Sequence, residues 1–265
     1  MIIVGELINA SRKSVSQSIE TGNGASIQQL ARDQFDAGAH YIDINAGVFV
    51  DEEVEYLKWL VNTVQSAVDC PCCIDSPSPK AIEAALAVHR STAMINSISL
   101  EKGRFDNLIP LIAGTDLKVV ALCMGDEGMP ETAGARIRIA DELINRLTKN
   151  NIPIDNIYVD PLLQPVATNT IYGIEFLNAV EKIIDAFPGV HTICGLSNIS
   201  YGLPERKLLN QSFMNMAIIK GLDAAVMDPL DKRMMAGILA AEVLAGKDNF
   251  CTRYLRAYRA QKLEF

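Results

Sequence analysis

Short amide and carboxylate side chains recur where apolar segments of this chain end. The set comprises Asn9, Asp43, Asn45, Asp75, Asn96, Asp160, Asn198 and Asp228. Carboxylates accept hydrogen bonds from amino and ring N–H groups, whereas amides both donate and accept. Such a set suits a flat, neutral heterocycle with a 2-amino-4-oxo edge, such as a pterin or a guanine. It does not suit a phosphate ester, which would call for Arg, Lys or a nest of backbone N–H groups.

Apolar runs and amphipathic segments alternate eight times along the chain, and this alternation must position those side chains. Most of the apolar runs are continuous, which is typical of parallel strands covered on both faces. The predicted strands are Ile2–Ile8, Tyr41–Asn45, Cys72–Ser76, Ala93–Ser97, Lys118–Met124, Asn156–Asp160, Thr192–Asn198 and Ala224–Asp228. The clearest predicted helices are Gln28–Ala37, Glu53–Val68, Ala81–Val88, Ala135–Lys149, Ile174–Phe187 and Met234–Ala245. Repeated strand–helix units predict parallel strands with right-handed crossovers.

Two architectures accommodate eight such units, a closed barrel and a doubly wound open sheet. An open-sheet nucleotide fold usually has a Gly-rich phosphate turn after its first strand. Here the first strand leads into Glu6-Leu7-Ile8-Asn9-Ala10, with neither a GxGxxG nor a Walker pattern. We therefore predict a single α/β domain over residues 1–265, a TIM (β/α)₈ barrel. The segment at about 249–265 is predicted to be a terminal helix on the barrel exterior or at a subunit contact.

In such a barrel the carboxyl ends of the strands converge on one mouth, where active sites of this fold lie. Asp and Asn can also simply cap the following helix or shape the βα turn, and this alternative stays open for each residue taken singly. Because polar residues end seven of the eight predicted strands, we favour a shared polar site. We expect most from Asp75, Asn96, Asp160 and Asn198.

The sequence disfavours both a metal centre and a nucleophilic hydrolase. Cys72 and Cys73 are adjacent, so on a strand they point to opposite faces. No second cysteine pair or nearby histidine completes four zinc ligands, so we expect core cysteines and no metal. His40 and His191 lie at the start of strands, the wrong end of a barrel for catalysis. His89 follows a predicted helix and is expected to face solvent or to cap that helix.

Composition limits the partners. The 265 residues carry a formal net charge of -8 at pH 7, whereas a nucleic-acid partner would need a basic patch. The start Met1-Ile2-Ile3-Val4-Gly5-Glu6 has no signal-peptide pattern, and no segment approaches the roughly 20 apolar residues of a membrane span. We expect no membrane association and a cytoplasmic location with reduced thiols.

Four strand-end segments resemble those of the pterin-binding methyltransferases. They are Cys73-Ile74-Asp75-Ser76, Ala93-Met94-Ile95-Asn96-Ser97, Tyr158-Val159-Asp160-Pro161-Leu162 and Gly195-Leu196-Ser197-Asn198-Ile199-Ser200. The segments at residues 3–9 and 221–225 fit as well, so the similarity runs in order along nearly the whole chain. The sequence is most similar to the methyltetrahydrofolate:corrinoid/iron–sulfur protein methyltransferases. It is more distantly similar to the folate module of cobalamin-dependent methionine synthase.

The resemblance implies a TIM barrel, usually a homodimer, that binds methyltetrahydrofolate or tetrahydrofolate as its substrate. Its activity would be methyl transfer between that folate and the cobalt of a corrinoid carried by a partner protein. The resemblance also implies that Asp75, Asn96 and Asp160 hydrogen-bond the pterin ring. Asn198 would be the catalytic residue, close to the ring nitrogen that carries the methyl group.

Other positions follow from the same resemblance. Gly195 and Ser197 would line the ring, and Arg206 would lie close to the rest of the folate. Tyr201 departs from the family pattern, because some relatives have a glutamine at this position. The departure bears on the contacts near the methyl group and on which corrinoid protein binds.

Two other functions remain open on the sequence. Dihydropteroate synthase also binds a pterin in a barrel, but that family has a Gly-rich loop with Lys after the sixth strand and an Arg-x-His motif near its end. This chain has Asp160-Pro161-Leu162-Leu163-Gln164-Pro165 and Met227-Asp228-Pro229-Leu230-Asp231 at those places. A non-catalytic folate-binding subunit is the second alternative. The chain contains no Asp-x-His-x-x-Gly corrinoid-binding motif, so we expect any corrinoid to arrive on another protein.

Overall fold

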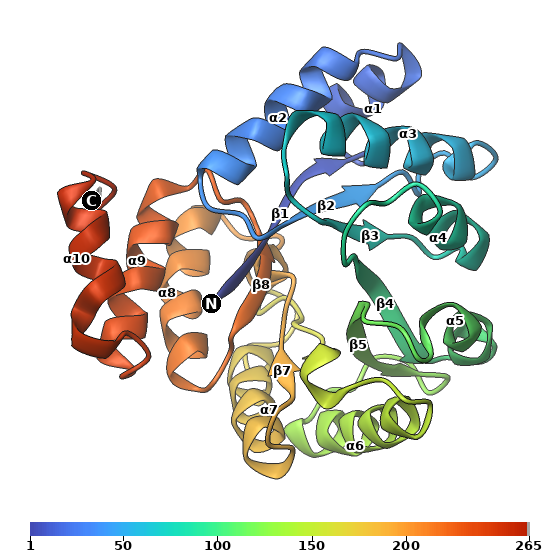
Figure 1. Ribbon diagram of the computed structural model, residues 1–265. Coiled ribbons are helices and arrows are strands. Elements are labelled where there is room, and N and C mark those ends of the chain that lie inside the picture. Colours follow the sequence, from blue (N-terminus) through green and yellow to red (C-terminus); the bar gives the residue numbers. More distant parts are fainter. Residues whose placement is uncertain (264–265) are drawn as a thin grey trace.

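Eight parallel strands form the centre of the molecule in the computed structural model, which describes residues 1–263. The strands curl into a ring with helices outside it (Figure 1). Each strand from β1 to β6 lies beside the next one in the chain, and β8 lies beside β1. The strands are β1 Ile2–Asn9, β2 Tyr41–Asn45, β3 Cys72–Asp75, β4 Met94–Leu100, β5 Lys118–Gly125, β6 Ile157–Asp160, β7 His191–Thr192 and β8 Ala224–Met227.

The ring closes between β7 and β8 through residues just past the short strand β7. Gly195 forms a parallel bridge with Val226, and the Val226 N–H donates to the carbonyl of Cys194 at 2.9 Å. With this closure every strand has a neighbour on both sides. The TIM-barrel prediction is therefore confirmed.

The helices cover the outside of the ring and bury the outward-facing apolar side chains of the strands. They are α1 Lys13–Glu20, α2 Gly24–Asp36, α3 Glu53–Ala67, α4 Pro79–Leu86, α5 Arg104–Ile112, α6 Ala133–Lys149, α7 Tyr172–Ala186, α8 Arg206–Ile219, α9 Lys232–Leu244 and α10 Thr252–Arg259. Several begin at a side-chain cap, a local signal that fixes where the loop ends. Ser78 accepts from the N–H of Ala81, and Asp231 accepts from the N–H of Met234.

The seventh strand differs from its prediction. The sequence indicates a strand over Thr192–Asn198, but β7 ends at Thr192, and Leu196–Ser200 form a short 3₁₀ helix, η2. Leu196 and Ile199 are buried three residues apart, as the three-residue period of a 3₁₀ helix requires. The small polar residues between them favour turns over strands. Asn198 therefore lies on a turn of helix above the barrel rather than on a strand.

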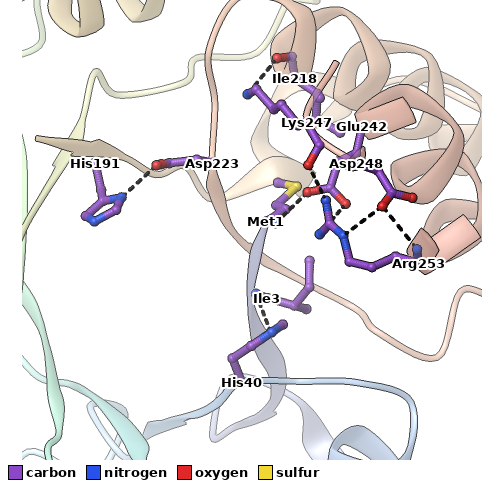
Figure 2. Close-up of polar contacts among 10 residues, drawn as sticks. All are labelled: Met1, Ile3, His40, His191, Ile218, Asp223, Glu242, Lys247, Asp248 and Arg253. Carbon is purple, nitrogen blue, oxygen red and sulfur yellow. Dashed lines mark hydrogen bonds and ion pairs between the residues drawn. The ribbon is translucent and has the colours of Figure 1, made fainter. Parts of the chain in front are cut away.

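Helix α10 lies outside α9 (Figure 1) and is held there by charged groups (Figure 2). Arg253 Nη1 lies 2.9 Å from Glu242 Oε2. The Asp248 carboxylate accepts the N–H groups of Arg253 and Tyr254, each at 3.0 Å. The helix predicted over about 249–265 is thus shorter, and residues 264–265 lie outside the described range.

No helix between residues 1 and 263 combines the length and the apolar character needed to cross a membrane.

Candidate functional site

Polar side chains form the layer directly above an apolar plug inside the barrel. The plug contains Val4, Cys73, Met94, Val120, Tyr158, Ile193 and Ala224. Side chains on a strand alternate between faces, so the residue two positions further along each strand also points inward. On β1 to β6 these residues are Glu6, Asp43, Asp75, Asn96, Leu122 and Asp160. Three of the expected site residues, Asp75, Asn96 and Asp160, thus face the same interior at the carboxyl ends of their strands.

Asp75 and Asn96 form the best-defined part of this layer. They are partners in register across β3 and β4 and line an open hollow of ≈ 550 Å³. Asn45 Nδ2 donates to Asp75 Oδ2 at 2.8 Å, which fixes the orientation of the carboxylate. Arg104 lines the same hollow. A carboxylate and an amide are thus presented side by side at the edge of a cavity.

A second hollow of ≈ 250 Å³ lies on the side of the mouth formed by β1 and β8. Its lining includes Glu6, Ser197, Arg206 and Asp228. Ser197 Oγ lies 3.5 Å from Glu6 Oε2. Burial raises the pKa of Glu6, and the neighbouring Asp228 charge adds to this shift, whereas Arg12 lowers the pKa. Positive and negative groups therefore line this hollow together.

Asp160 lies in the interior and lines neither hollow. Its Oδ1 accepts the N–H of Leu162 at 2.8 Å. Burial raises the pKa of Asp160 from its ordinary 3.8 to about 7, although the Leu162 N–H and the Arg136 charge both lower it. Asp160 therefore exchanges a proton near neutral pH, and it can accept a hydrogen bond in one state and donate in the other.

Asp43 is a buried carboxyl beneath the Asp75–Asn96 pair. Its Oδ1 has no hydrogen-bond partner. Burial raises the pKa of Asp43 well above its ordinary value, and the charge of Asp75 raises it further. The pKa of Asp75 is also raised by burial, against the lowering effects of Asn45 and Arg104. Because two buried carboxyls this close resist ionising together, we assign the proton to Asp43 and the charge to Asp75.

The residues expected near the methyl group lie on η2 and past it. Asn198 is exposed, and an added Cβ on Gly195 would lie 3.2 Å from Asn198 Nδ2. A glycine at 195 therefore leaves room for the amide. Tyr201 is 67% exposed, and its ring centroid lies 5.9 Å from Arg206 Cζ. Arg206 Nη2 donates to the carbonyl of Ser197 at 2.6 Å, so this arginine also braces the segment that carries Asn198.

Several of the strand-end Asn and Asp side chains also shape turns, which is the alternative role considered from the sequence. This role is compatible with a shared site. Asn9, Asn45, Asp160 and Asp228 each use Oδ1 to accept the N–H two residues later, at distances of 2.8 to 3.0 Å. This is the pattern of an Asx turn. The turn uses only one side-chain heteroatom of each residue, and in Asn45 the other one, Nδ2, binds Asp75. The helix caps, in contrast, are other residues such as Ser78 and Asp231.

Sequence reasoning did not select several residues of the polar layer. Glu6 is a charged residue inside an otherwise apolar strand, and that interruption was the available signal. Asp43 lies in the middle of the predicted strand Tyr41–Asn45 and is not among the four residues from which we expect most. Arg104 and Arg136 lie on helices, where no local pattern separates an inward-facing arginine from a surface one. The locations of their guanidinium groups are apparent only in the folded barrel.

The cysteines and histidines are not members of this layer, although the Cys73 thiol contacts the Asp43 carboxyl. Cys72 packs in the outer core and Cys73 in the plug, on opposite faces of β3 as predicted. Within residues 1–263, no group of three or more His, Cys, Asp or Glu side chains could hold a metal ion. The expectation for His89 was wrong, because its Nε2 accepts the N–H of Cys72 at 2.9 Å, at the start of β3. His191 Nδ1 lies 2.6 Å from Asp223 Oδ2 (Figure 2).

Comparison with known proteins agrees with this geometry. A family model described as pterin binding enzyme matches residues 5–228. The chain is 37% identical to the methylcorrinoid:tetrahydrofolate methyltransferase of Eubacterium limosum over 265 residues, which is 99% of this chain and 98% of that protein. It is 30% identical to the methionine synthase of Mycobacterium tuberculosis over 239 residues, 85% of this chain and 20% of that protein.

Solved structures share the fold. Dihydropteroate synthase from Xanthomonas albilineans in complex with 7,8-dihydropteroate has a TM-score of 0.69 and 17% identity, covering 92% of this chain and 91% of its own. The Thermus thermophilus enzyme has a TM-score of 0.65 and 19% identity, covering 81% of this chain and 87% of its own. At such identities the likeness shows the fold alone.

Proposed function

The chain belongs to the pterin binding enzyme family, and from this premise we propose that it transfers a methyl group between tetrahydrofolate and a corrinoid held by another protein. The single observation that carries this proposal is the row of Asp75, Asn96 and Asp160 facing one barrel interior. The full-length similarity to a methylcorrinoid:tetrahydrofolate methyltransferase supports the choice of reaction.

The polar layer suits the edge of a pterin ring. A charged Asp75 accepts the 2-amino and ring N–H groups, and the Asn96 amide both donates and accepts. Asn45 holds the carboxylate before the ligand arrives, so less conformational freedom is lost on binding. The neutral Asp43 below places no second negative charge against the ring. This arrangement orients the substrate without forming a covalent bond to it.

Methyl transfer requires the ring nitrogen to change its protonation. The corrinoid supplies the methyl carrier, and its cobalt keeps the electron pair of the carbon–cobalt bond when the methyl group leaves. The Asn198 amide can donate to or accept from the ring nitrogen without becoming charged. Asp160, with a pKa of about 7, can hold a proton during the reaction. The protein's contribution is therefore orientation and stabilisation of developing charge.

The partner we propose is a corrinoid protein that covers the barrel mouth. The chain itself lacks the Asp-x-His-x-x-Gly motif for that cofactor. We also expect a homodimer in the cytoplasm. Leu208, Met216 and Ile219 leave apolar side chains of α8 at least half exposed, which a second subunit could cover. Sedimentation of the purified chain tests the dimer.

The test is a reconstituted reaction. The protein is mixed with tetrahydrofolate and a methylated corrinoid protein, and the absorbance of the released cobalt(I) is followed. The reverse mixture contains methyltetrahydrofolate and the reduced corrinoid protein. We expect turnover in both directions, because one active site catalyses both. Tetrahydrofolate binding without any transfer would favour a non-catalytic folate-binding subunit. Formation of dihydropteroate from a pterin diphosphate and p-aminobenzoate would favour a synthase.

A further inference from the structure

An arginine donates hydrogen bonds to the backbone directly beside each of the expected ring-facing side chains. The clearest case is Arg136 on α6, whose side chain is fully buried. Its Nε donates to the carbonyl of Pro161 at 2.7 Å, and its Nη1 donates to the carbonyl of Glu131 at 2.8 Å. Its Nη2 lies 3.4 Å from the carbonyl of Leu162. One guanidinium thus joins the loop after β5 to the loop after β6.

The Arg136 contacts lead to Asp160 through one further hydrogen bond. Leu162, whose carbonyl faces Arg136, donates its own N–H to Asp160 Oδ1 at 2.8 Å. Leu162 has a φ of +62°, in the left-handed region that a leucine rarely adopts. The loop therefore holds an unfavourable backbone conformation at the residue that orients the Asp160 carboxyl. The carbonyls that Arg136 binds lie on both sides of the Leu162 amide nitrogen.

Arg104, the first residue of α5, has the same relation to Asp75 and Asn96. Its Nη2 donates to the carbonyl of Ser76 at 2.9 Å, and its Nε donates to the carbonyl of Ser97 at 3.0 Å. Ser76 follows Asp75 and Ser97 follows Asn96 in the sequence. One side chain thus joins the ends of β3 and β4, next to the two residues that line the larger hollow.

Arg206, the first residue of α8, completes the set beside Asn198. Its Nη2 donates to the carbonyl of Ser197, and its Nε donates to Ser200 Oγ at 3.1 Å. Both partners lie on η2 with Asn198 between them. The arginine therefore spans the one helical turn that presents the amide.

The positions of these arginines need an explanation, because a positive charge near the start of a helix does not stabilise that helix. A cation in the first turn of a helix opposes the helix dipole. Arg104 and Arg206 each occupy the first position of their helix, and Arg136 follows the first turn of α6. Arg136 also gives up hydration completely on burial. The planar guanidinium can bind several carbonyls in fixed directions, which the single ammonium of lysine cannot do.

We propose that Arg104, Arg136 and Arg206 are positioning residues, each of which fixes the loop that aims a polar side chain at the substrate. The proposal rests on the proposed function for the identity of the substrate, a reduced pterin. Arg136 acts through Asp160, Arg104 acts through Asp75 and Asn96, and Arg206 acts through Asn198. None of the three has to touch the pterin ring for this role.

The decisive experiment is a double-mutant cycle with tetrahydrofolate as the probe. Arg136→Lys keeps the positive charge but loses the planar guanidinium that binds several carbonyls. Asp160→Asn removes the carboxylate. We expect Arg136→Lys to weaken tetrahydrofolate binding about tenfold in the native background, but less than twofold in the Asp160→Asn background. Arg138→Lys is the matched control, because Arg138 lies exposed on the same helix, and it should leave binding unchanged. Equal weakening in both backgrounds would show a general structural role and overturn the proposal.

A ligand-free measurement separates this proposal from the proposed function. Amide hydrogen exchange at Leu162 should accelerate at least tenfold in Arg136→Lys, with the plug strands unchanged. Unchanged exchange at Leu162 overturns the proposal even if the protein binds no folate at all. If Arg136→Lys fails to fold, the half-buried Arg104 provides the second arm. Arg104→Lys should then weaken binding in the native protein but not in the double variant Asp75→Asn/Asn96→Ala, and additive losses would contradict the proposal.

Discussion

Replacing Asp160 with asparagine should stabilise the protein while it weakens the substrate site. Burial raises the pKa of Asp160 from 3.8 to about 7. An acid whose pKa is higher in the folded than in the unfolded protein destabilises the fold once it ionises. The stabilisation that the neutral acid provides to the folded protein is fully present below the unfolded pKa. This stabilisation is lost as the pH rises from about 4 to about 7. Each pKa unit corresponds to about 1.4 kcal/mol, so the loss is at most about 4 kcal/mol.

The asparagine variant keeps the shape and the local hydrogen bond. Its amide oxygen can still accept the N–H of Leu162, while the buried charge is removed. Because Asp160 retains some solvent exposure, we expect a gain of about 2 to 3 kcal/mol in the free energy of unfolding at pH 8, below the full linkage value. At pH 4.5, close to the unfolded pKa, most of this difference should have disappeared, because Asp160 in the folded protein is then neutral.

Substrate binding should change in the opposite direction. A hydrogen bond from a ring N–H to a carboxylate contributes about 1.5 to 3 kcal/mol, so Asp160→Asn should weaken tetrahydrofolate binding by roughly 10- to 150-fold at pH 8. The native protein should also lose affinity as the pH falls below about 7, and the variant should not. Urea unfolding and calorimetric titration between pH 4.5 and 8.5 measure both effects. A variant that is less stable than the native protein at pH 8 would refute this reasoning, as would one with the same pH dependence of binding.

Three further predictions concern the helix above the mouth and the lower end of the barrel. Asn198→Ala should slow single-turnover methyl transfer by more than about tenfold, or 1.4 kcal/mol, and an unchanged rate would remove Asn198 from the mechanism. Gly195→Ala should also slow methyl transfer, because the added Cβ displaces the Asn198 amide. A native rate would show that the close approach of residue 195 to Asn198 has no role. The histidines should act in the opposite direction to Asp160 below about pH 6.5, because burial lowers the pKa of His40 and His89, so the unfolded chain binds protons that the folded chain does not. Replacing each histidine with glutamine should make the urea midpoint at pH 5.5, relative to that at pH 7.5, higher than in the native protein, and the same difference in native and variant proteins would contradict this.

Much of the fold was predictable because its signals are local. Continuous apolar runs separated by amphipathic segments specify buried parallel strands and covering helices, and the missing phosphate turn separates a barrel from an open sheet. The segment Thr192–Asn198 was the exception. Its apolar residues suit a strand and a 3₁₀ helix equally over so short a stretch. The packing of Leu196 and Ile199 in one cluster with Phe176 of α7 and Phe213 of α8 decides between the two.

The candidate site was predictable only where strand periodicity exposes it. Asp75, Asn96 and Asp160 end apolar runs, so their types and positions in the sequence indicate an inward-facing polar layer. Arg104 and Arg136 carry no such signal, because their partners are backbone carbonyls of other strand–helix units. The proton assigned to Asp43 also depends on burial, which only the assembled barrel creates.

Competition by fragments of the substrate tests the central claim most directly. A bare reduced pterin and p-aminobenzoylglutamate are each titrated against bound tetrahydrofolate in the native protein, in Asp75→Asn and in Asn96→Ala. If the polar layer hydrogen-bonds the edge of the pterin ring, the bare pterin displaces tetrahydrofolate from the native protein. It also binds at least tenfold more weakly to both variants. Displacement by p-aminobenzoylglutamate alone, or pterin binding that both substitutions leave intact, would contradict the account.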